Sequence, residues 1–351
     1  MLTPRTRVQR RPVHGVLLLD KPLGVSSNQA LQRAKWLLRA EKAGHTGTLD
    51  PLATGVLPLC FGAATKFSQL QLEADKSYLA TARLGVRTST GDAEGEVIAT
   101  RPVQVTAADL LRVQLQFFGS QRQLPPMYSA LKKDGKPLYD YARQGIEVER
   151  ALRDVIVHRL QLGPTRGSDA SPLSSMDIVT TVSKGTYIRA LAEDIGEALG
   201  CGAHLTALRR TATGGFAASD CLTLEALDGM DEDQRLAQLL PVEALLADHT
   251  RVMLAEQDAG RFLSGLRRRG EWADAAAVAV FAPSPAGGGL GWGCGGAAIP
   301  LPAFHRTGKE LPVFLGSGHI KAGELIPDRL LSPIEIQQIA LAKTATTETT
   351  P

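Results

Sequence analysis

The chain has 351 residues, of which 44% are hydrophobic and 21% are charged, so its composition is that of a soluble globular protein and excludes a largely disordered one. Its length is enough for two domains. The net charge is only +3, but residues 1–50 contain nine Lys and Arg against three Asp and Glu, and residues 201–250 contain three against eight. This asymmetry is compatible with one basic face that meets a polyanion, although charged runs are more often ordinary solvated surface.

Targeting and cysteine signals are weak. Residues 1–12 read as a basic, flexible arm, and the apolar run that follows is short and broken by Asp20, so neither a signal peptide nor a membrane span is predicted. We therefore expect a cytoplasmic protein with no membrane partner. The cysteines are far apart and form no Cys-x-x-Cys motif: Cys60, Cys201, Cys221 and Cys294. This spacing suggests neither a zinc site nor a disulfide framework.

The first predicted elements are a strand and a helix. The apolar segment "HGVLLLDKP", residues 14–22, predicts a buried strand. Residues 26–44 then predict a helix, with Ser26 or Ser27 as the N-cap and Gly44 as the stop. An Asp-Pro loop follows this helix directly.

That loop, "AGHTGTLDPLATGVLPL" at residues 43–59, contains an isolated carboxylate, Asp50, among Gly, Thr and Pro. A turn is the simpler interpretation, because Asp-Pro pairs favour turns and the residue before a proline is pushed to extended backbone. A functional role is the alternative, since loops held by a rigid scaffold often carry functional side chains.

The remaining elements predict a mixed α and β fold with antiparallel strands. Residues 76–100 show the alternation and Gly-Asp turns of such strands, and residues 175–202 read as strand, turn and helix. The acidic segment at residues 228–249 reads as a junction to a second unit that begins near residue 250. Within that unit, residues 287–296 include seven glycines and predict a flexible loop, and the threonine-rich residues 340–351 predict a disordered tail.

Aromatic and basic residues are interleaved in the segment "PPMYSALKKDGKPLYDYARQG", residues 125–145. Basic side chains can meet phosphates and aromatic rings can stack on bases, which is the combination that single-stranded or loop RNA requires. An ordinary exposed loop with amphipathic tyrosines is the alternative. The residues concerned are Tyr128, Tyr139, Tyr141, Lys132, Lys133, Lys136 and Arg143.

Several long motifs resemble the bacterial tRNA pseudouridine-55 synthases of the TruB family. They are "GVLLLDKPLGVSSN", "GHTGTLDPLATGVLPLCFGAATK", "MYSALKKDGKPLYDYARQGIEV" and "SKGTYIRALAEDIGEALGCGAHLTALRR". The resemblance implies an α+β pseudouridine synthase fold with a mixed, largely antiparallel sheet and flanking helices over residues 13–240, in which residues 121–150 form a clamp. It also implies a small PUA-like, RNA-binding β domain over residues 250–335, although the glycine-rich run departs from the usual spacing.

The resemblance assigns roles to particular residues. Asp50 would be the catalytic carboxylate, Tyr78 would pack on the target base and move a proton, and Arg189 would pair with Asp50. The residues implied to bind or support the substrate are His45, Tyr187, Leu208, Lys21, Lys132, Lys133, Lys136 and Arg143. The resemblance thus makes Tyr78 and Arg189 catalytic residues beside Asp50. Structural alternatives exist: Tyr78 and Leu208 could fill the core, Arg189 could be a surface arginine, and His45 could cap backbone groups.

The implied reaction is the isomerisation of uridine to pseudouridine at position 55 in the T-loop of tRNA, by base flipping and without a guide RNA. The reaction consumes nothing, so no redox or metal cofactor is expected. A glycoside hydrolase usually needs two carboxylates, whereas Asp50 has no companion in its motif. An arginine partner would keep that carboxylate ionised and oriented. Three roles of Asp50 stay open: attack on C1′, addition to C6 of the ring, or removal of a proton from C2′.

The expected partner is the T-arm of tRNA, and the enzyme would act as a monomer. Two other functions remain open. A non-catalytic tRNA-binding or tRNA-folding protein would not need Asp50, Tyr78 and Arg189 together. A guide-RNA-dependent pseudouridine synthase subunit shares the Asp loop but usually lacks the clamp.

Overall fold

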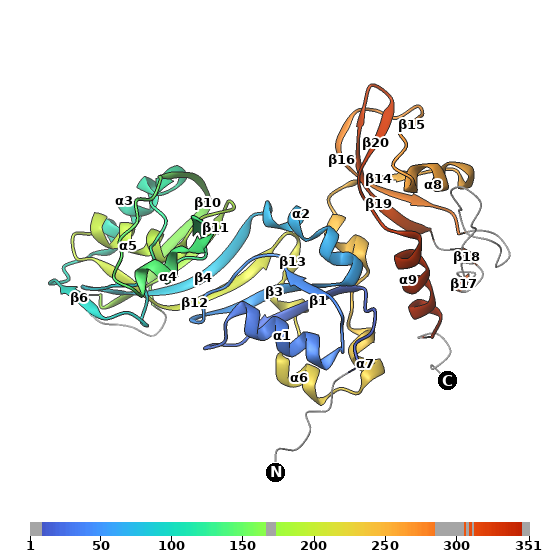
Figure 1. Cartoon of the computed structure of the whole chain (residues 1–351). Coiled ribbons are helices and arrows are strands. Elements are labelled where there is room, and N and C mark those ends of the chain that lie inside the picture. Colours follow the sequence, from blue (N-terminus) through green and yellow to red (C-terminus); the bar gives the residue numbers. More distant parts are fainter. Residues whose placement is uncertain (1–8, 166–172, 285–304, 307–308, 311, 346–351) are drawn as a thin grey trace, which may run out of the picture.

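A computed structural model describes residues 9–165, 173–284, 305–306, 309–310 and 312–345. Figure 1 shows a long sheet that carries helices at one end. A separate small β unit lies beyond its other end. The α-helices are α1 (Ser27–Leu37), α2 (Ser68–Leu72), α3 (Ala107–Gln116), α4 (Leu138–Ala142), α5 (Ile188–Ala198), α6 (Leu224–Gly229), α7 (Glu232–Ala237), α8 (Glu256–Leu263) and α9 (Pro333–Ala345). The 3-10 helices are η1 (Gly62–Lys66), η2 (Ala218–Asp220) and η3 (Val242–Leu246).

The strands of the larger, N-terminal unit are β1 (Gly15–Lys21), β2 (Ala43–His45), β3 (Ala53–Phe61), β4 (Lys76–Leu84), β5 (Val86–Thr88), β6 (Val97–Thr100), β7 (Gly119–Gln123), β8 (Lys132–Lys133), β9 (Lys136–Pro137), β10 (Arg153–Pro164), β11 (Ser175–Val182), β12 (Ala203–Thr213) and β13 (Phe216–Ala217). Those of the C-terminal unit are β14 (Thr250–Met253), β15 (Arg268–Arg269), β16 (Ala275–Ala282), β17 (His305–Arg306), β18 (Lys309–Glu310), β19 (Val313–Lys321) and β20 (Glu324–Leu330).

The large sheet has the strand order β1-β3-β12-β4-β11-β10-β7, with β2 beside β3 and β13 beside β12. Its neighbours are antiparallel except for β12 and β3, which run parallel. The smaller sheet has the order β14-β16-β19-β20-β15. The expected α+β class, with a mixed but largely antiparallel sheet, flanking helices and a small C-terminal β domain, is therefore confirmed.

Strand β1 is covered on both faces, which explains its apolar run. Leu17 and Leu19 belong to a core shared with α1, α3, α5 and α6, whereas Val16 and Leu18 belong to a second core with η1, η3 and the C-terminal unit. A strand buried on both faces reads as a continuous apolar run rather than an alternating one. The buried strand predicted at residues 14–22 is therefore confirmed.

Helix α1 begins as predicted but ends early. Ser26 is the N-cap of a capping box that is completed by Gln29. The helix stops at Leu37 rather than near Gly44, because Arg39 takes a left-handed φ of 52° and the chain turns into β2. The prediction of a helix to residue 44 is wrong, since the apolar spacing continued past a turn that no glycine or proline announced.

The two ends of the chain also differ from the expectations. At the N-terminus, Arg10 donates to the Lys35 carbonyl and Arg11 forms an ion pair with Glu232, so this part of the expected flexible arm is held against α1 and α7. At the C-terminus, α9 continues to Ala345, where a disordered tail was expected from residue 340. The glycine-rich run at residues 287–296 lies outside the described residues.

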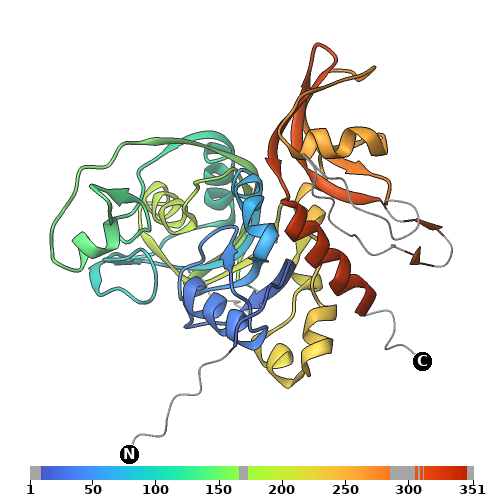
Figure 2. The ribbon, with the colours of Figure 1, turned by 45° about the vertical axis from the view of Figure 1, so that its right-hand side comes forward.

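The C-terminal unit begins with β14 at Thr250, where a second unit was expected, and it is joined to the larger one by polar and apolar contacts. The Lys66 ammonium contacts Glu335 at 2.6 Å, and the imidazole of His14 contacts the Gln338 amide at 2.9 Å. Figure 2 shows α9 alongside the blue N-terminal region. Within the described residues, no helix is long and apolar enough to cross a membrane.

We expect Phe67→Ala to destabilise the protein by about 3–5 kcal/mol, the usual cost of emptying a buried phenylalanine site. Phe67 is fully buried, and its ring centroid lies 5.4 Å from that of Phe314 in the C-terminal unit. Urea unfolding would measure the loss, with Phe118→Ala as the control because Phe118 is 58% exposed. Equal effects of the two substitutions would contradict the role given to this contact.

Candidate active site

Asp50 lies on the loop between β2 and β3, at the edge of the core to which α1 and α5 contribute. Its side chain is 38% exposed, and its Oδ2 atom lies 2.9 Å from Nη2 of Arg189. Arg189 is the second residue of α5, and its side chain is only 4% exposed. The ion pair that the resemblance implied is therefore present, and it joins a buried guanidinium to a half-exposed carboxylate.

Arg189 has further partners that hold its orientation. Nε lies 3.5 Å from Oδ2 of the buried Asp92, Nη1 donates to the Thr90 carbonyl over 2.9 Å, and Nη2 donates to the Tyr128 carbonyl over 2.7 Å. A buried arginine needs such compensation, because an unpaired charge in a protein interior is costly. The guanidinium thus has little freedom, and Asp50 meets it from the solvent side.

Asp92 is a site residue that the sequence reasoning missed. Its carboxylate accepts from the Glu94 N–H over 3.1 Å and from the Thr90 hydroxyl, so the turn that carries it also orients it. In the sequence it stands in a Gly-Asp pair that looked like an ordinary turn between strands. No local signal could have found it, because the contact with Arg189 joins segments almost 100 residues apart.

An apolar surface lies beside the ion pair. Leu208 on β12 is the register partner of both Ala53 and Ala80, and Tyr78 on β4 is the register partner of Arg210 and Thr180. Tyr78 and Leu208 are both buried, at 9% and 8% exposure, and both belong to the α1-side core. Neighbouring strands thus place an aromatic ring and a leucine on one face.

Tyr187 is the N-cap residue of α5, directly before the helix that carries Arg189. Its backbone N–H and carbonyl are both bonded to the Gln123 side chain, over 2.7 and 3.1 Å. Burial raises the pKa of the Tyr187 phenol, so its hydroxyl stays protonated through the neutral range. Gln123, which the sequence did not single out, fixes this residue.

His45 and Lys21 lie close to the loop of Asp50. Burial, and to a lesser degree the charge of Arg210, lower the pKa of His45, which favours the neutral imidazole. The Lys21 side chain is fully buried, and its ammonium donates to the carbonyls of Pro22, Val25 and, over 3.4 Å, Pro51. Lys21 therefore holds the strand end and the residue after Asp50 together.

The three expected clamp lysines are exposed and lie on a hairpin. Strands β8 and β9 are joined by Asp134 and Gly135, with φ values of 50° and 80°, the left-handed pair that an Asp-Gly hairpin turn requires. Lys132, Lys133 and Lys136 are all solvent-exposed. The guanidinium of the exposed Arg143 lies 5.3 Å from the centre of the Tyr139 ring.

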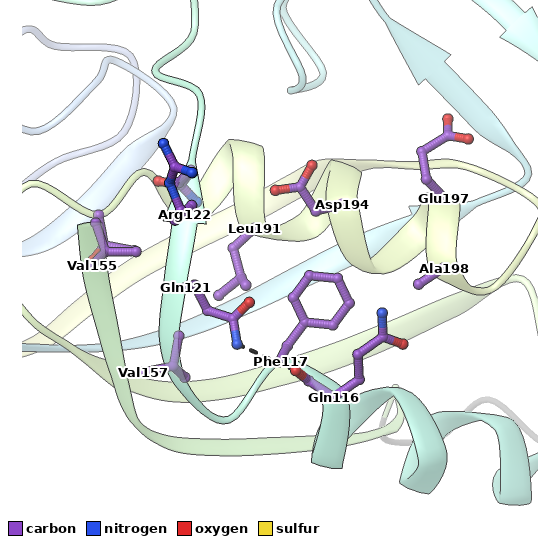
Figure 3. Close-up of a pocket in the computed structure, with 12 residues that line it drawn as sticks. Gln116, Phe117, Gln121, Arg122, Val155, Val157, Leu191, Asp194, Glu197 and Ala198 are labelled. Atoms are coloured by element: carbon purple, nitrogen blue, oxygen red, sulfur yellow. Dashed lines mark hydrogen bonds between the residues drawn. The ribbon is translucent and has the colours of Figure 1, made fainter. Parts of the chain in front are cut away.

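A cavity of about 330 Å³ lies on another side of α5. Figure 3 shows Leu191, Asp194 and Ala198 from that helix facing Phe117 across it. Burial, with the neighbouring charge of Glu197, raises the pKa of Asp194. Neither Asp50 nor Arg189 lines this cavity, so it is distinct from the site around the ion pair.

Cysteine and metal chemistry add little to the site. Cys60, Cys201 and Cys221 are free thiols, and burial raises the pKa of Cys60 to about 12, so it stays a thiol. Cys294 lies outside the described residues. In the part of the chain that the structure describes, there is no group of three or more His, Cys, Asp and Glu residues that could hold a metal ion.

Comparisons with known proteins identify the family. Residues 35–188 match the N-terminal domain of TruB family pseudouridylate synthases, and residues 189–247 match the C-terminal domain of tRNA pseudouridylate synthase B. A tRNA pseudouridine synthase B from Verminephrobacter eiseniae is 59% identical over 338 residues, which cover 95% of this chain and 94% of that protein. The chain belongs to the TruB family.

Other relatives agree. A tRNA pseudouridine synthase B from Ralstonia nicotianae is 61% identical over 258 residues, 74% of this chain and 82% of that protein. A chain in a crystal structure of a Cbf5-Nop10-Gar1 complex superposes with a TM-score of 0.62 at 24% identity, covering 92% of this chain and 87% of that one. This likeness concerns the fold, which is that of the pseudouridine synthases.

We expect the contribution of Lys21 to stability to depend on pH. Burial lowers its pKa from 10.5 to about 8, against the attraction of Asp50 and Glu94. Between those values the unfolded chain binds the proton more tightly than the folded one, so raising the pH stabilises the fold. The free energy of unfolding of wild type relative to Lys21→Met should therefore rise from pH 8 to 10.5.

Chemical denaturation at several pH values would measure this difference. Lys42→Met is the control, because Lys42 is exposed and the difference from wild type should then stay constant. A constant difference for Lys21→Met as well would contradict the lowered pKa.

Proposed function

We propose that this protein converts uridine to pseudouridine at position 55 in the T-loop of tRNA, without a guide RNA and in the cytoplasm. The single observation that carries the proposal is the half-exposed Asp50 held by the buried Arg189. The names of the relatives, tRNA pseudouridine synthase B, support the substrate class. The reaction is an isomerisation, because the N1–C1′ bond breaks and the same uracil rejoins the ribose through C5.

Asp50 is the catalytic carboxylate in this proposal. One of its oxygens is taken by Arg189, which orients the group, and the exposed part of the carboxylate faces the substrate. Arg189 and Asp92 are buried behind it and hold its direction. A charge-assisted contact of this kind fixes geometry more strongly than a neutral hydrogen bond does.

The other site residues receive the flipped base. A base inside a folded RNA arm must leave its stack to reach a carboxylate, and it then needs an aromatic or apolar surface. Tyr78 and Leu208 provide that surface, and the Tyr78 hydroxyl moves a proton. Tyr187 and the neutral His45 border the pocket, and Lys21 supports the loop of Asp50.

The exposed hairpin and the C-terminal unit would bind the tRNA. Lys132, Lys133 and Lys136 can meet neighbouring phosphates because they share a short hairpin. Arg143 is placed to meet the arm from the next segment. The C-terminal unit would act as a PUA-like RNA-binding domain, and a monomer would suffice, since all the named residues come from one chain.

Two alternatives make different predictions. A tRNA-binding or tRNA-folding protein without catalysis would have no use for a buried arginine that orients a half-exposed carboxylate. A subunit of a guide-RNA-dependent particle would need a guide RNA for turnover. In the proposed function the hairpin at residues 132–137 binds the tRNA directly, so no guide RNA is needed. A tritium-release assay on uridine-labelled tRNA, with and without added guide RNA, separates the three functions.

We expect Asp50→Asn to abolish isomerisation while leaving tRNA binding nearly intact, because the substitution removes a charge but almost no volume. Tritium release from tRNA under single-turnover conditions would measure the rate, and filter binding would measure the affinity. Asp20→Asn is a matched control, since Asp20 also pairs with an arginine, Arg209, at 2.6 Å. Turnover of the Asp50 variant near the wild-type rate would contradict the catalytic role of this carboxylate.

We expect the triple substitution of Lys132, Lys133 and Lys136 by alanine to flatten the salt dependence of tRNA binding. Each phosphate contact contributes roughly 0.7–0.9 log units of affinity per log unit of salt, so three contacts contribute about two to three units. Saturating tRNA should restore most of the rate, because phosphate contacts position the substrate and do not carry out the chemistry.

Binding titrations over a range of salt concentrations would measure the slope. Asp134→Asn is the control, since asparagine also accepts a left-handed backbone and leaves the three lysines in place. An unchanged slope in the triple variant, or a low single-turnover rate at saturation, would contradict the electrostatic role of the hairpin.

A further inference from the structure

Arg210 is a buried charge next to the site, and neither the ion pair nor the base-binding surface uses it. It lies on β12, where its register partners are Gly55 of β3 and Tyr78 of β4. It is among the largest fully buried side chains, with 2% exposure. Among the described residues, no carboxylate forms an ion pair with it. A charge buried in this way must be compensated by hydrogen bonds, so the partners of Arg210 show what its side chain holds.

The hydrogen bonds of Arg210 go to the loop that carries Asp50 and to β3, the strand that follows this loop. Nε donates to the Val56 carbonyl over 2.7 Å, and Nη2 donates to the Gly47 carbonyl over 3.3 Å. Gly47 precedes Asp50 and Val56 follows it, so one planar, rigid group ties both flanks of the loop to β12. Guanidinium is suited to this task because its donors have a fixed geometry and it stays charged.

Two glycines, one on each side of Asp50, lie against Arg210. A Cβ atom at Gly55 would lie 2.1 Å from the Arg210 carbonyl oxygen, and one at Gly47 would lie 3.5 Å from Nη1 of Arg210. Both glycines also have positive φ values, 101° and 152°, that other residues rarely adopt. Gly55 therefore marks the close approach of β3 to the backbone of Arg210, and Gly47 makes an ordinary contact with its guanidinium.

We propose that Arg210 is a positioning residue for Asp50, which it fixes by anchoring the loop at Gly47 and Val56. The inference rests on the proposed function, in which Asp50 acts on the uridine. Without this anchor the loop keeps its sequence and Asp50 keeps Arg189 as a partner, but the carboxylate spends less time in the productive orientation. Misplacement of a reacting group by about 1 Å can cost about 100-fold in rate, so the effect falls on the chemical step.

The charge of Arg210 provides a second readout that does not depend on turnover. Together with burial, which is the larger cause, it lowers the pKa of His45. Replacing the guanidinium by a neutral side chain should therefore raise the pKa of His45, and replacing it by an ammonium should not. This readout reports the charge of Arg210 beside His45, whereas the single-turnover rate reports the position of Asp50.

The experiment compares Arg210→Met, Arg210→Lys and the control Arg209→Met. Arg209 is adjacent on the same strand but pairs with Asp20 at 2.6 Å. For Arg210→Met we expect a single-turnover rate at saturating tRNA that is about 10- to 100-fold lower, with tRNA affinity changed by less than about twofold. Arg210→Lys should lose less, because an ammonium can still reach one carbonyl, and Arg209→Met should stay within about twofold.

Proton NMR titration of His45 in the same variants, without tRNA, supplies the second measurement. The proposal is overturned if Arg210→Met turns over at the wild-type rate, or if the loss lies entirely in tRNA affinity. Should Arg210→Met fail to fold, Arg210→Lys decides, and a wild-type rate there overturns the proposal. If wild type itself shows no turnover, the proposed function fails, whereas an increased His45 pKa in Arg210→Met still supports the contact between Arg210 and the loop.

Discussion

The requirement to compensate one buried guanidinium organises this site. Arg189 is buried at the start of α5, and its nitrogens reach Asp50, Asp92 and the backbone carbonyls of Thr90 and Tyr128. These partners come from the β2–β3 loop, the β5–β6 connection and the segment after β7. Because an unpaired buried charge is costly, the three segments are held together by the same group that orients the carboxylate.

The large sheet makes this convergence possible. Strands β1 and β3 contribute residues to both cores, the one shared with α1, α3, α5 and α6 and the one shared with η1, η3 and the C-terminal unit. Loops that start from such strands have fixed ends, so a short loop such as the one around Asp50 has few conformations left. Lys21 and Arg210 restrict it further, since Lys21 donates to the Pro51 carbonyl and Arg210 donates to the carbonyls of Gly47 and Val56.

Local patterns in the sequence predicted much of the fold. The features that depend on long-range contacts could not be predicted in this way. The apolar run of β1, the Ser26 cap of α1 and the strand, turn and helix around Arg189 follow from neighbouring residues, and the structure confirms them. The early end of α1 did not follow, because a non-glycine residue, Arg39, makes the left-handed turn. Asp50 stood out because of its motif. Asp92 and Arg210 did not, because their contacts join segments that are far apart in the chain.

The contact between Arg189 and the Tyr128 carbonyl links the clamp to the ion pair. Tyr128 lies near the start of the segment that leads into the β8–β9 hairpin, and the Ser129 carbonyl accepts from the Tyr139 N–H at the start of α4. The exposed lysines of the hairpin and the buried arginine are thus connected through a few backbone hydrogen bonds. A displacement of Tyr128 would remove one of the bonds that hold Arg189, and Arg189 is the group that holds Asp50. The position of the β8–β9 hairpin and the orientation of the carboxylate are therefore not independent in this fold.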